Sequence, residues 1–462
     1  MENKLKYNRV GAVSLGCSKN TVDTEIMLGE LASLGFTVVS DPAEAEIIIV
    51  NTCGFITSAK QDSIDTILDM AQYKTAGSCK FLAVTGCLSE RYRNELPPEL
   101  PEVDLFWGVR DYPAFARELY RVIAGEEAPS SDEASSVPHS IVCGDVHRLV
   151  STPPWRAYLR IADGCDNRCT YCAIPLIRGG RVSVPMEKLI DEAKALAASG
   201  VTELTVIAQD TSAYGIDLYG RPMLRELLAA LSAIEGFVWI RVLYAYPNTI
   251  TEELVDAMRD DPKIVNYIDI PIQHISKRML TAMNRHGSAE HIRQICAYIR
   301  KNAPDFILRT TVMLGFPGET EEDFNELMAF LAEQPFDRIG AFVYSPEDGT
   351  PAAEMPDQVD EAVAEARLDA VMRRQQAISL ELNKKRIGST VRVLVESVMP
   401  SPKGNGYTAI GRSYAEAADV DGVIRLRPES GRPFRLPQPG EYVWARITKA
   451  YQYDLEAVVP GE

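Results

Sequence analysis

Short apolar runs alternate with amphipathic stretches through the first part of the chain. The runs 10–15, 46–51 and 80–85 have the length and apolar content of buried strands. In the stretches 21–34 and 58–73, apolar residues recur at helical spacing, as in a helix with one buried face. Strands that alternate with helices predict a parallel α/β sheet, here an N-terminal domain over residues 7–123.

The same alternation continues over residues 151–386. A long amphipathic stretch at 359–386 is expected to end this region as a helix. Six strands are expected, over residues 157–161, 204–208, 238–243, 267–270, 307–314 and 338–343. Strands separated by helices in this way predict a partial β/α barrel, whose chemistry would lie at the C-terminal ends of its strands.

The two α/β regions are separated by residues 124–150, and a different pattern follows them. Residues 124–138 are small, acidic or proline and show no apolar periodicity, which is typical of a solvated linker. Near the end of the chain, short alternating runs such as 391–395 and 442–447 are punctuated by Gly and Pro. We therefore expect an α/β protein that carries a small all-β barrel over residues 387–458.

Composition and charge narrow the classes of protein. Of 462 residues, 46% are apolar and 24% charged, which is ordinary for globular proteins and excludes a disordered or collagen-like chain. The formal charge of −17, from 65 acidic and 48 basic residues, makes a long nucleic-acid backbone a poor partner and a basic molecule a better one. The chain starts without the apolar core of a signal peptide, and no run of 18 apolar residues occurs, so we expect a cytoplasmic protein without membrane association.

Nine cysteines in a reducing compartment do not indicate a disulfide framework, so metal or redox chemistry is expected for some of them. Cys165, Cys169 and Cys172 form a CxxxCxxC triplet directly after an expected strand. Three thiolates at this spacing can bind three irons of a 4Fe-4S cluster and leave the fourth iron open for reaction. A structural zinc site would need a fourth ligand, which the local loop does not supply.

A second set of cysteines follows the strands of the N-terminal domain. Cys17, Cys53 and Cys87 each end an expected strand and precede an expected helical segment. Because parallel strands end at one edge of their sheet, the three thiols can converge, and we expect a second three-thiolate cluster there. The alternative is that they are simply core cysteines. The remaining cysteines are expected to be structural: Cys79, Cys143 and Cys296.

The CxxxCxxC triplet at the start of a six-strand β/α region resembles the radical SAM superfamily. The resemblance implies that S-adenosylmethionine (SAM) chelates the open iron and is cleaved to a deoxyadenosyl radical. Gln209 and Asp210 follow the second barrel strand, and His274 follows the fourth, so these side chains are candidates for cofactor contacts. Loop capping by Gln209 and Asp210, and an ordinary buried histidine at 274, explain the same positions equally well. The turn at 315–320 follows the fifth strand, and it can be explained either as a loop that contacts the cofactor or as ordinary helix capping.

Two cysteine trios, a radical SAM barrel and a C-terminal β-barrel together resemble the methylthiotransferases over nearly the whole chain. The resemblance implies that Cys17, Cys53 and Cys87 bind an auxiliary 4Fe-4S cluster and that the CxxxCxxC trio binds the SAM cluster. It also implies a TRAM-like barrel that handles a macromolecular substrate. One SAM would methylate a sulfur at the auxiliary cluster, and another would supply the radical, with sulfur and electron donors as further partners.

Two branches of this family differ in substrate. The runs 14–20, 51–56 and 164–169 are similar to the RimO-like branch, which modifies the β-carbon of an aspartate in the twelfth protein of the small ribosomal subunit. Residues 389–462 carry 9 basic and 9 acidic side chains, so the expected substrate domain lacks the basic surplus that tRNA would favour. A basic ribosomal protein is therefore the expected partner. The alternatives are a tRNA adenosine (N6-isopentenyl or threonylcarbamoyl) methylthiotransferase and a non-catalytic RNA-binding protein with zinc–thiolate sites.

Overall fold

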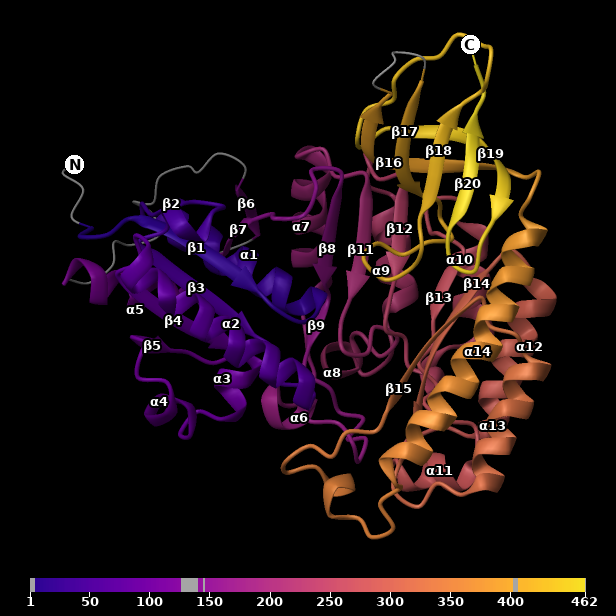
Figure 1. Cartoon of the computed structure of the whole chain (residues 1–462), viewed down its shortest axis with the longest axis horizontal. Helices are drawn as coiled ribbons and strands as arrows, with labels where there is room; N and C mark the ends of the chain where they lie inside the picture. Colours follow the sequence, from indigo (N-terminus) through magenta and orange to yellow (C-terminus); the bar gives the residue numbers. More distant parts are fainter. Residues whose placement is uncertain (1–4, 126–139, 144–145, 402–405, 462) are drawn as a thin grey trace. The chain divides into compact units, whose positions relative to one another are not determined.

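The computed structural model describes residues 5–125, 140–143, 146–401 and 406–461 (Figure 1). The chain forms two compact units. The first comprises Met1–Phe237 with Ser345–Glu354, and the second comprises Val238–Tyr344 with Met355–Glu462. All six cysteines of the two expected trios belong to the first unit. None of the helices in the described ranges is long and apolar enough to span a lipid bilayer.

A five-stranded parallel sheet forms the centre of the N-terminal domain. Its order is β2-β1-β3-β4-β5, so β1 and β3 are neighbours although β2 separates them in the chain. The strands are β1 (Arg9–Ser14), β2 (Thr37–Val38), β3 (Ile47–Thr52), β4 (Phe81–Gly86) and β5 (Leu105–Phe106). The expected parallel sheet is thus confirmed. The order places a topological switch point between β1 and β3, where ligands of open α/β sheets commonly bind.

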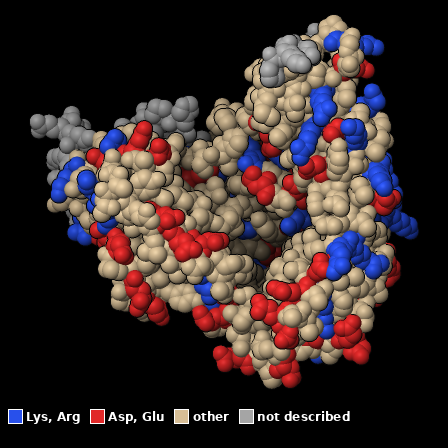
Figure 2. Space-filling model, viewed as in Figure 1, with Lys and Arg blue, Asp and Glu red and all other residues tan. Residues whose placement is uncertain are grey.

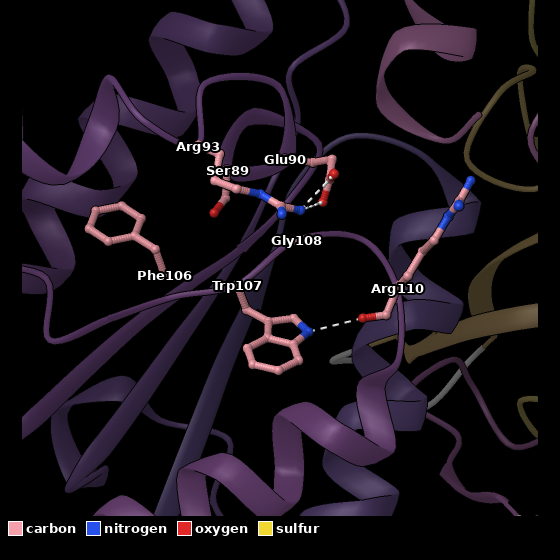
Figure 3. Close-up of a pocket in the computed structure, with 7 residues that line it drawn as sticks. All are labelled: Ser89, Glu90, Arg93, Phe106, Trp107, Gly108 and Arg110. Atoms are coloured by element: carbon pink, nitrogen blue, oxygen red, sulfur yellow. Dashed lines mark hydrogen bonds and ion pairs between the residues drawn. The ribbon is translucent and has the colours of Figure 1, made fainter.

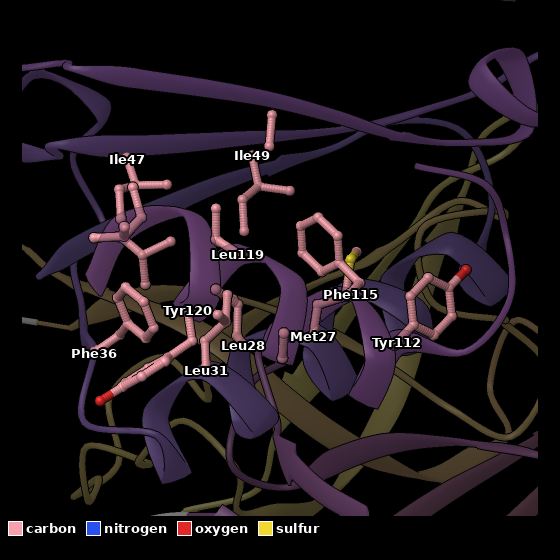
Figure 4. Close-up of a cluster of buried hydrophobic side chains, with 14 residues drawn as sticks. Met27, Leu28, Leu31, Phe36, Ile47, Ile49, Tyr112, Phe115, Leu119 and Tyr120 are labelled. Atoms are coloured by element: carbon pink, nitrogen blue, oxygen red, sulfur yellow. The ribbon is translucent and has the colours of Figure 1, made fainter. Parts of the chain in front are cut away.

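Helices cover both faces of this sheet because alternate side chains of its strands point to opposite faces. Ile47 and Ile49 of β3 pack with Met27 of α1 and Phe115 of α5 on one face (Figure 4). Ile48 and Val50 enter a second core with Ile67 of α2 on the other face. The helices of the domain are α1 (Ser18–Ser33), α2 (Thr57–Ala76), α3 (Cys87–Arg91), α4 (Leu96–Glu99) and α5 (Tyr112–Ala124). Each fully buried aliphatic side chain contributes about 1.5–3 kcal/mol, so β3, buried on both faces, anchors the domain.

The expected linker over 124–150 contains secondary structure at its end. Strands β6 (Ser140–Cys143) and β7 (Val146–Leu149) pair as an antiparallel hairpin, and residues 126–139 of the expected linker lie outside the described residues. β7 lies against α1, where the buried Arg148 pairs with Glu25. The composition of residues 124–138 gave no sign of the hairpin, because its attachment depends on ion pairs with distant helices.

The first unit also contains the start of the expected β/α barrel. Strand β8 (Arg156–Arg160) pairs in parallel with β11 (Glu203–Ile207), and β9 (Ala162–Asp163) pairs antiparallel with β10 (Val182–Ser183). The helices of this part are α6 (Ile174–Ile177), α7 (Met186–Ala198), α8 (Ile216–Tyr219) and α9 (Leu224–Ser232). The loop between β9 and α6 carries the CxxxCxxC triplet, so the triplet follows a strand as expected.

In the second unit the remaining barrel strands form a parallel sheet of order β13-β14-β15. The strands of that sheet are β13 (Tyr267–Asp269), β14 (Ile307–Leu314) and β15 (Arg338–Val343). β12 (Trp239–Val242) comes before them in the chain and is not a member of that sheet. The helices of this unit are α10 (Glu252–Asp260), α11 (Lys277–Ala282), α12 (Ala289–Asn302), α13 (Glu321–Glu333) and α14 (Glu361–Lys385). Each of the six expected barrel strands has a counterpart within the described residues 156–343.

The end of the chain is a closed five-stranded barrel of order β16-β17-β18-β20-β19, as predicted. Its strands are β16 (Thr390–Pro400), β17 (Tyr407–Arg412), β18 (Ile424–Pro428), β19 (Tyr442–Ala450) and β20 (Leu455–Val459). Alternate residues such as Val393, Ile424 and Ile447 fill its interior. Full closure leaves no unpaired edge strand.

Candidate metal centres

The N-terminal cysteines lie at the C-terminal edge of the parallel sheet. Cys17 follows β1, Cys53 follows β3, and Cys87 begins α3 directly after β4. The three strands are neighbours and in register, with Asn51 of β3 opposite Ser14 of β1 and Thr85 of β4. The cysteines therefore leave the sheet at the same edge, beside the switch point between β1 and β3.

Glycines let the three cysteine loops approach one another closely. A Cβ at Gly16, which has φ of +89°, would lie 3.0 Å from the Sγ of Cys53. A Cβ at Gly54 would lie 2.7 Å from the Cα of Leu88, the residue after Cys87. Side chains at these two positions would push the loops apart, so the structure brings the three cysteine loops together at a distance that only glycine allows.

Asn20, on the first turn of α1, contacts all three cysteine loops. Its Nδ2 donates to the carbonyl of Leu15 at 2.8 Å and to that of Thr52 at 2.9 Å, the residues that lead into the first two loops. Its Oδ1 lies 3.7 Å from the Sγ of Cys87 and accepts a hydrogen bond from Arg178 at 2.8 Å. One buried amide thus fixes the relative positions of the loops.

Burial dominates the electrostatics of the Cys53 and Cys87 thiols. It raises the pKa of Cys53, and the neighbouring Cys17 raises it further. Burial raises the pKa of Cys87 to about 12, opposed by the positive charge of Arg178, while Cys17 and Cys53 add to the rise. The thiols therefore affect one another as close neighbours do. Without a bound cation, Cys53 and Cys87 are held as neutral thiols at neutral pH, and a metal would have to displace their protons.

The CxxxCxxC loop is held by backbone contacts on both sides. The N–H of Cys165 donates to the carbonyl of Gly179 at 3.1 Å, and the N–H of Cys172 donates to the carbonyl of Cys169 at 3.0 Å. Arg168 has φ of +50°, which turns the chain sharply between the first two cysteines. These contacts fold the loop back on itself and keep the three thiols on one short turn.

Gln209 and Asp210 lie beside this loop, at the end of β11. Asp210 accepts a hydrogen bond at 2.8 Å from Asn167, whose Nδ2 also lies 3.4 Å from the Sγ of Cys165. Gln209 donates to Asp163 at 2.9 Å. Burial raises the pKa of Cys165, and the charge of Asp210 raises it further. Both side chains therefore support the cysteine loop through hydrogen bonds.

His274 belongs to the second unit, where it is fully buried after β13. Its Nδ1 accepts hydrogen bonds from the backbone N–H groups of Ile275 at 2.9 Å and Ser276 at 3.0 Å. Its Nε2 lies 3.9 Å from Glu319, whose carboxylate accepts the N–H of Gly315. In this unit His274 fixes the turn that follows its strand. Cys79 and Cys296 are buried, and the side chain of Cys143 lies outside the described residues.

Sequence reasoning missed three residues that contact the cysteines: Asn20 and Arg178 beside Cys87, and Asn167 beside Cys165. Asn20 lies in the same run as Cys17 and could have been noticed as a polar residue on the first turn of a helix. Arg178 carries no comparable local signal, since its partners come from α1 and α3.

Each cysteine trio supplies three soft sulfur donors, the ligand type of iron–sulfur clusters. No group of three or more His, Cys, Asp or Glu side chains in the described parts of the chain is arranged to hold one metal ion. A cubane cluster takes each thiolate on a different iron, so its ligands need not converge on one point. Each trio offers soft sulfur donors, and the loops before Cys17 and Cys87 carry glycines in the left-handed region.

A hollow of about 450 Å³ lies nearby, at the ends of β4 and β5. Its polar side chains already have partners (Figure 3): Glu90 accepts from Arg93 at 2.8 Å, and Trp107 donates to the carbonyl of Arg110 at 2.9 Å. None of the six cysteines lines it, so it is not part of either candidate centre.

Comparisons with known proteins agree with this layout. Residues 9–108 match the uncharacterized protein family UPF0004, residues 159–331 the radical SAM superfamily, and residues 387–459 the TRAM domain. The ribosomal protein uS12 methylthiotransferase RimO of Pelotomaculum thermopropionicum is 48% identical over 448 residues, which cover 97% of this chain and 98% of that protein. The chain belongs to the RimO family. RimO of Clostridioides difficile is 46% identical over 447 residues, covering 97% of this chain and 98% of that protein.

The RimO-family chain is a radical SAM methylthiotransferase, and neither the tRNA branch nor the zinc-binding alternative is favoured. The family uses SAM together with iron–sulfur chemistry. A solved structure of the radical S-adenosylmethionine methyltransferase TsrM from Kitasatospora setae has a TM-score of 0.55 at 13% identity, covering 86% of this chain and 79% of that one. That likeness concerns the fold alone.

Proposed function

We propose that this chain transfers a methylthio group to the β-carbon of an aspartate in ribosomal protein uS12. The observation that carries the proposal is identity of 46–48% over nearly the whole length of proteins named uS12 methylthiotransferase. The runs around Cys17, Cys53 and Cys165 support the same branch.

We further propose that the chain holds two 4Fe-4S clusters. Cys165, Cys169 and Cys172 would hold the one that binds SAM, and the trio at the sheet edge would hold the auxiliary one. When bound, SAM and the clusters would supply the methylthio group and the chemistry that abstracts a hydrogen atom from the substrate. The chain's own residues orient these groups: Asp210 and Asn167 hold the loop of Cys165 in place. Gln209 supports the same loop, and a cofactor contact by His274 stays a prediction.

The surface charge supports a basic protein substrate. Asp62, Asp65 and Asp69 are exposed along one face of α2, and Glu95 and Glu99 are exposed around α4. Figure 2 shows acidic side chains gathered over this part of the N-terminal domain. The β-barrel has no net charge to offset them, with 9 basic and 9 acidic residues in 389–462. Such a surface attracts a basic ribosomal protein and repels an RNA backbone.

A paired assay tests the substrate. The anaerobically reconstituted enzyme receives SAM, a reductant and a sulfide source, with uS12 in one reaction and tRNA in the other. Peptide mass spectrometry should find a methylthio group on one aspartate of uS12. If only tRNA were modified, the chain would instead belong to the tRNA-modifying branch of the methylthiotransferases. Purified protein that contains zinc but neither iron nor sulfide would instead favour the binding protein.

Cysteine variants test the division of labour between the two trios. Cys169→Ala should abolish formation of deoxyadenosine, because the SAM cluster loses a ligand. Cys53→Ala should still form deoxyadenosine but should not transfer the methylthio group. Cys79→Ala, which changes a buried cysteine outside both trios, is the matched control and should retain both activities. Methylthio transfer by Cys53→Ala would show that Cys53 is only a packing residue.

A further inference from the structure

Arg178 is a buried cation that contacts the N-terminal cysteines. It follows α6 directly after the CxxxCxxC loop, and only 1% of its surface is exposed. Its Nη2 lies 3.7 Å from the Sγ of Cys87, at hydrogen-bond distance for sulfur. Its positive charge also acts on Cys53, where it opposes the effect of burial on the pKa.

Three other groups fix the direction of this guanidinium. Nη2 donates to Asn20 at 2.8 Å and to Asp23 of α1 at 2.7 Å, and Nη1 donates to Asp163 of β9 at 3.0 Å. Asp23 also pairs with Arg160. Two arginines and two aspartates therefore balance one another before any thiolate charge is added. Added negative charge at the cysteines would lie beside the Nη2 of this fixed cation, which shares its two hydrogens among Asn20, Asp23 and the Sγ of Cys87.

The segment that carries Arg178 also holds the other cysteine loop. The carbonyl of Gly179 accepts the N–H of Cys165, and a Cβ at Gly164 would lie 2.7 Å from the same carbonyl oxygen. Ala173 and Ile177, at the two ends of α6, pack against Cys87. Adjacent residues of one short segment thus contact both cysteine loops.

We propose that Arg178 is a positioning residue for the auxiliary cluster, which it hydrogen-bonds at the sulfur of Cys87 and whose reduction potential it raises. The inference rests on the proposed function, since it requires a cluster on Cys17, Cys53 and Cys87. A positive charge and a hydrogen bond at a ligand sulfur stabilise the more negative, reduced state of a cluster. A hydrogen bond to a charged group changes an equilibrium constant about tenfold. For a one-electron couple this corresponds to ~59 mV in the reduction potential.

The test isolates the auxiliary cluster. In a full-length background with Cys165, Cys169 and Cys172 changed to alanine, the reconstituted protein holds only that cluster. Its midpoint potential is then measured by redox titration followed by electron paramagnetic resonance, with iron and sulfide content determined on the same samples. This readout does not depend on catalysis.

Charge-balanced double variants separate the sulfur contact from general stability. Asp23→Asn with Arg178→Gln removes one buried ion pair and the contact to Cys87. Asp23→Asn with Arg160→Gln removes a matched ion pair and leaves that contact in place. In the first variant the midpoint potential should be ~59 mV more negative, which corresponds to a tenfold change in the equilibrium constant. The second variant should keep the parental midpoint potential. Arg178→Lys, which retains the charge, should fall between parent and the first variant.

The outcomes are distinguishable. Equal midpoints in the two double variants, with iron content equal to the parent, would overturn the role of Arg178 and leave the proposed function intact. If the first variant does not fold, Arg178→Lys provides the test. A midpoint potential of Arg178→Lys equal to that of the parent would contradict the inference. A triple-alanine background that binds no iron and sulfide would overturn the auxiliary cluster itself, and the inference with it.

Discussion

Breaking the ion pair between Arg148 and Glu25 should strongly destabilise the first unit. Arg148 of β7 is 1% exposed, and the side chain of Glu25 on α1 is 0% exposed. The Oε2 of Glu25 accepts from Arg148 at 2.9 and 2.6 Å, and its Oε1 accepts from the N–H and hydroxyl of Ser151 at 2.7 and 2.8 Å. Arg148→Leu would leave a buried carboxylate without its cation.

The magnitude follows from what remains around Glu25. Removing one partner of a buried pair costs about 3–5 kcal/mol, because the other charge stays desolvated. The bonds from Ser151 remain, which places the cost at the low end of that range. Glu192, the second partner of Arg148, is 16% exposed and can be hydrated when the arginine is lost. We therefore expect a loss of about 3 kcal/mol in the free energy of unfolding of the first unit.

Urea unfolding followed by tryptophan fluorescence can measure this loss. Trp107 and Trp155 belong to the first unit, and the tryptophans of the second unit are Trp239 and Trp444. Replacing these two with phenylalanine removes the tryptophan fluorescence of the second unit. Arg121→Leu is the matched control, since it breaks a half-exposed pair with Glu118 on α5 and should cost less than about 1 kcal/mol. If Arg148→Leu and the control unfold at the same urea concentration, the buried pair does not stabilise this unit.

Three further changes have expected outcomes. Gly16→Ala should lower the iron content at the auxiliary site but not at the SAM site, because its Cβ would meet Cys53 and its φ is left-handed; iron analysis in single-trio backgrounds checks this. Glu347→Ala should speed protease cleavage of its own loop, because the buried carboxylate binds two cations of the N-terminal domain; limited proteolysis with mass spectrometry measures the rate. Burial alone would raise the pKa of Glu416, but ion pairing, chiefly with Arg386, holds this pKa at about 2. The ionised carboxylate therefore stabilises the folded protein fully above pH 4.5, and this stabilisation is lost as the pH falls toward 2. Glu416→Gln should therefore be less stable than the parent by about 3 kcal/mol above pH 4.5, and the difference in urea midpoint should vanish near pH 2.

The sequence predicted those features that depend on local pattern. The apolar run of β3 is buried on both faces, so its strand could be recognised without knowledge of its neighbours. The spacing of the CxxxCxxC triplet depends on one loop and was visible in the same way. The rule that parallel strands end at one edge of their sheet was sufficient to predict that Cys17, Cys53 and Cys87 leave the sheet at the same edge.

Features that depend on tertiary contacts could not be predicted. The sheet order β2-β1-β3 is not encoded in the periodicity of the strands, yet it decides which loops are neighbours. The hairpin of β6 and β7 follows a stretch with linker composition and is attached through Arg148, whose partner Glu25 lies far away in the chain. Arg178 is likewise an arginine without a motif, and only the packing of α6 brings it to Cys87.

The sheet order also explains why one edge of the sheet gathers three cysteines and receives a second cysteine loop. α1 and α2, which follow β1 and β3, cover opposite faces of the sheet, so their connections diverge at the switch point between the two strand ends. Cys17 and Cys53 lie in these two connections. The segment with Arg178 reaches this edge of the sheet directly after the loop of Cys172. That segment contacts one cysteine loop through the side chain of Arg178 and the other through the carbonyl of Gly179. Under the proposed function, a substitution in this segment would therefore act on both candidate centres.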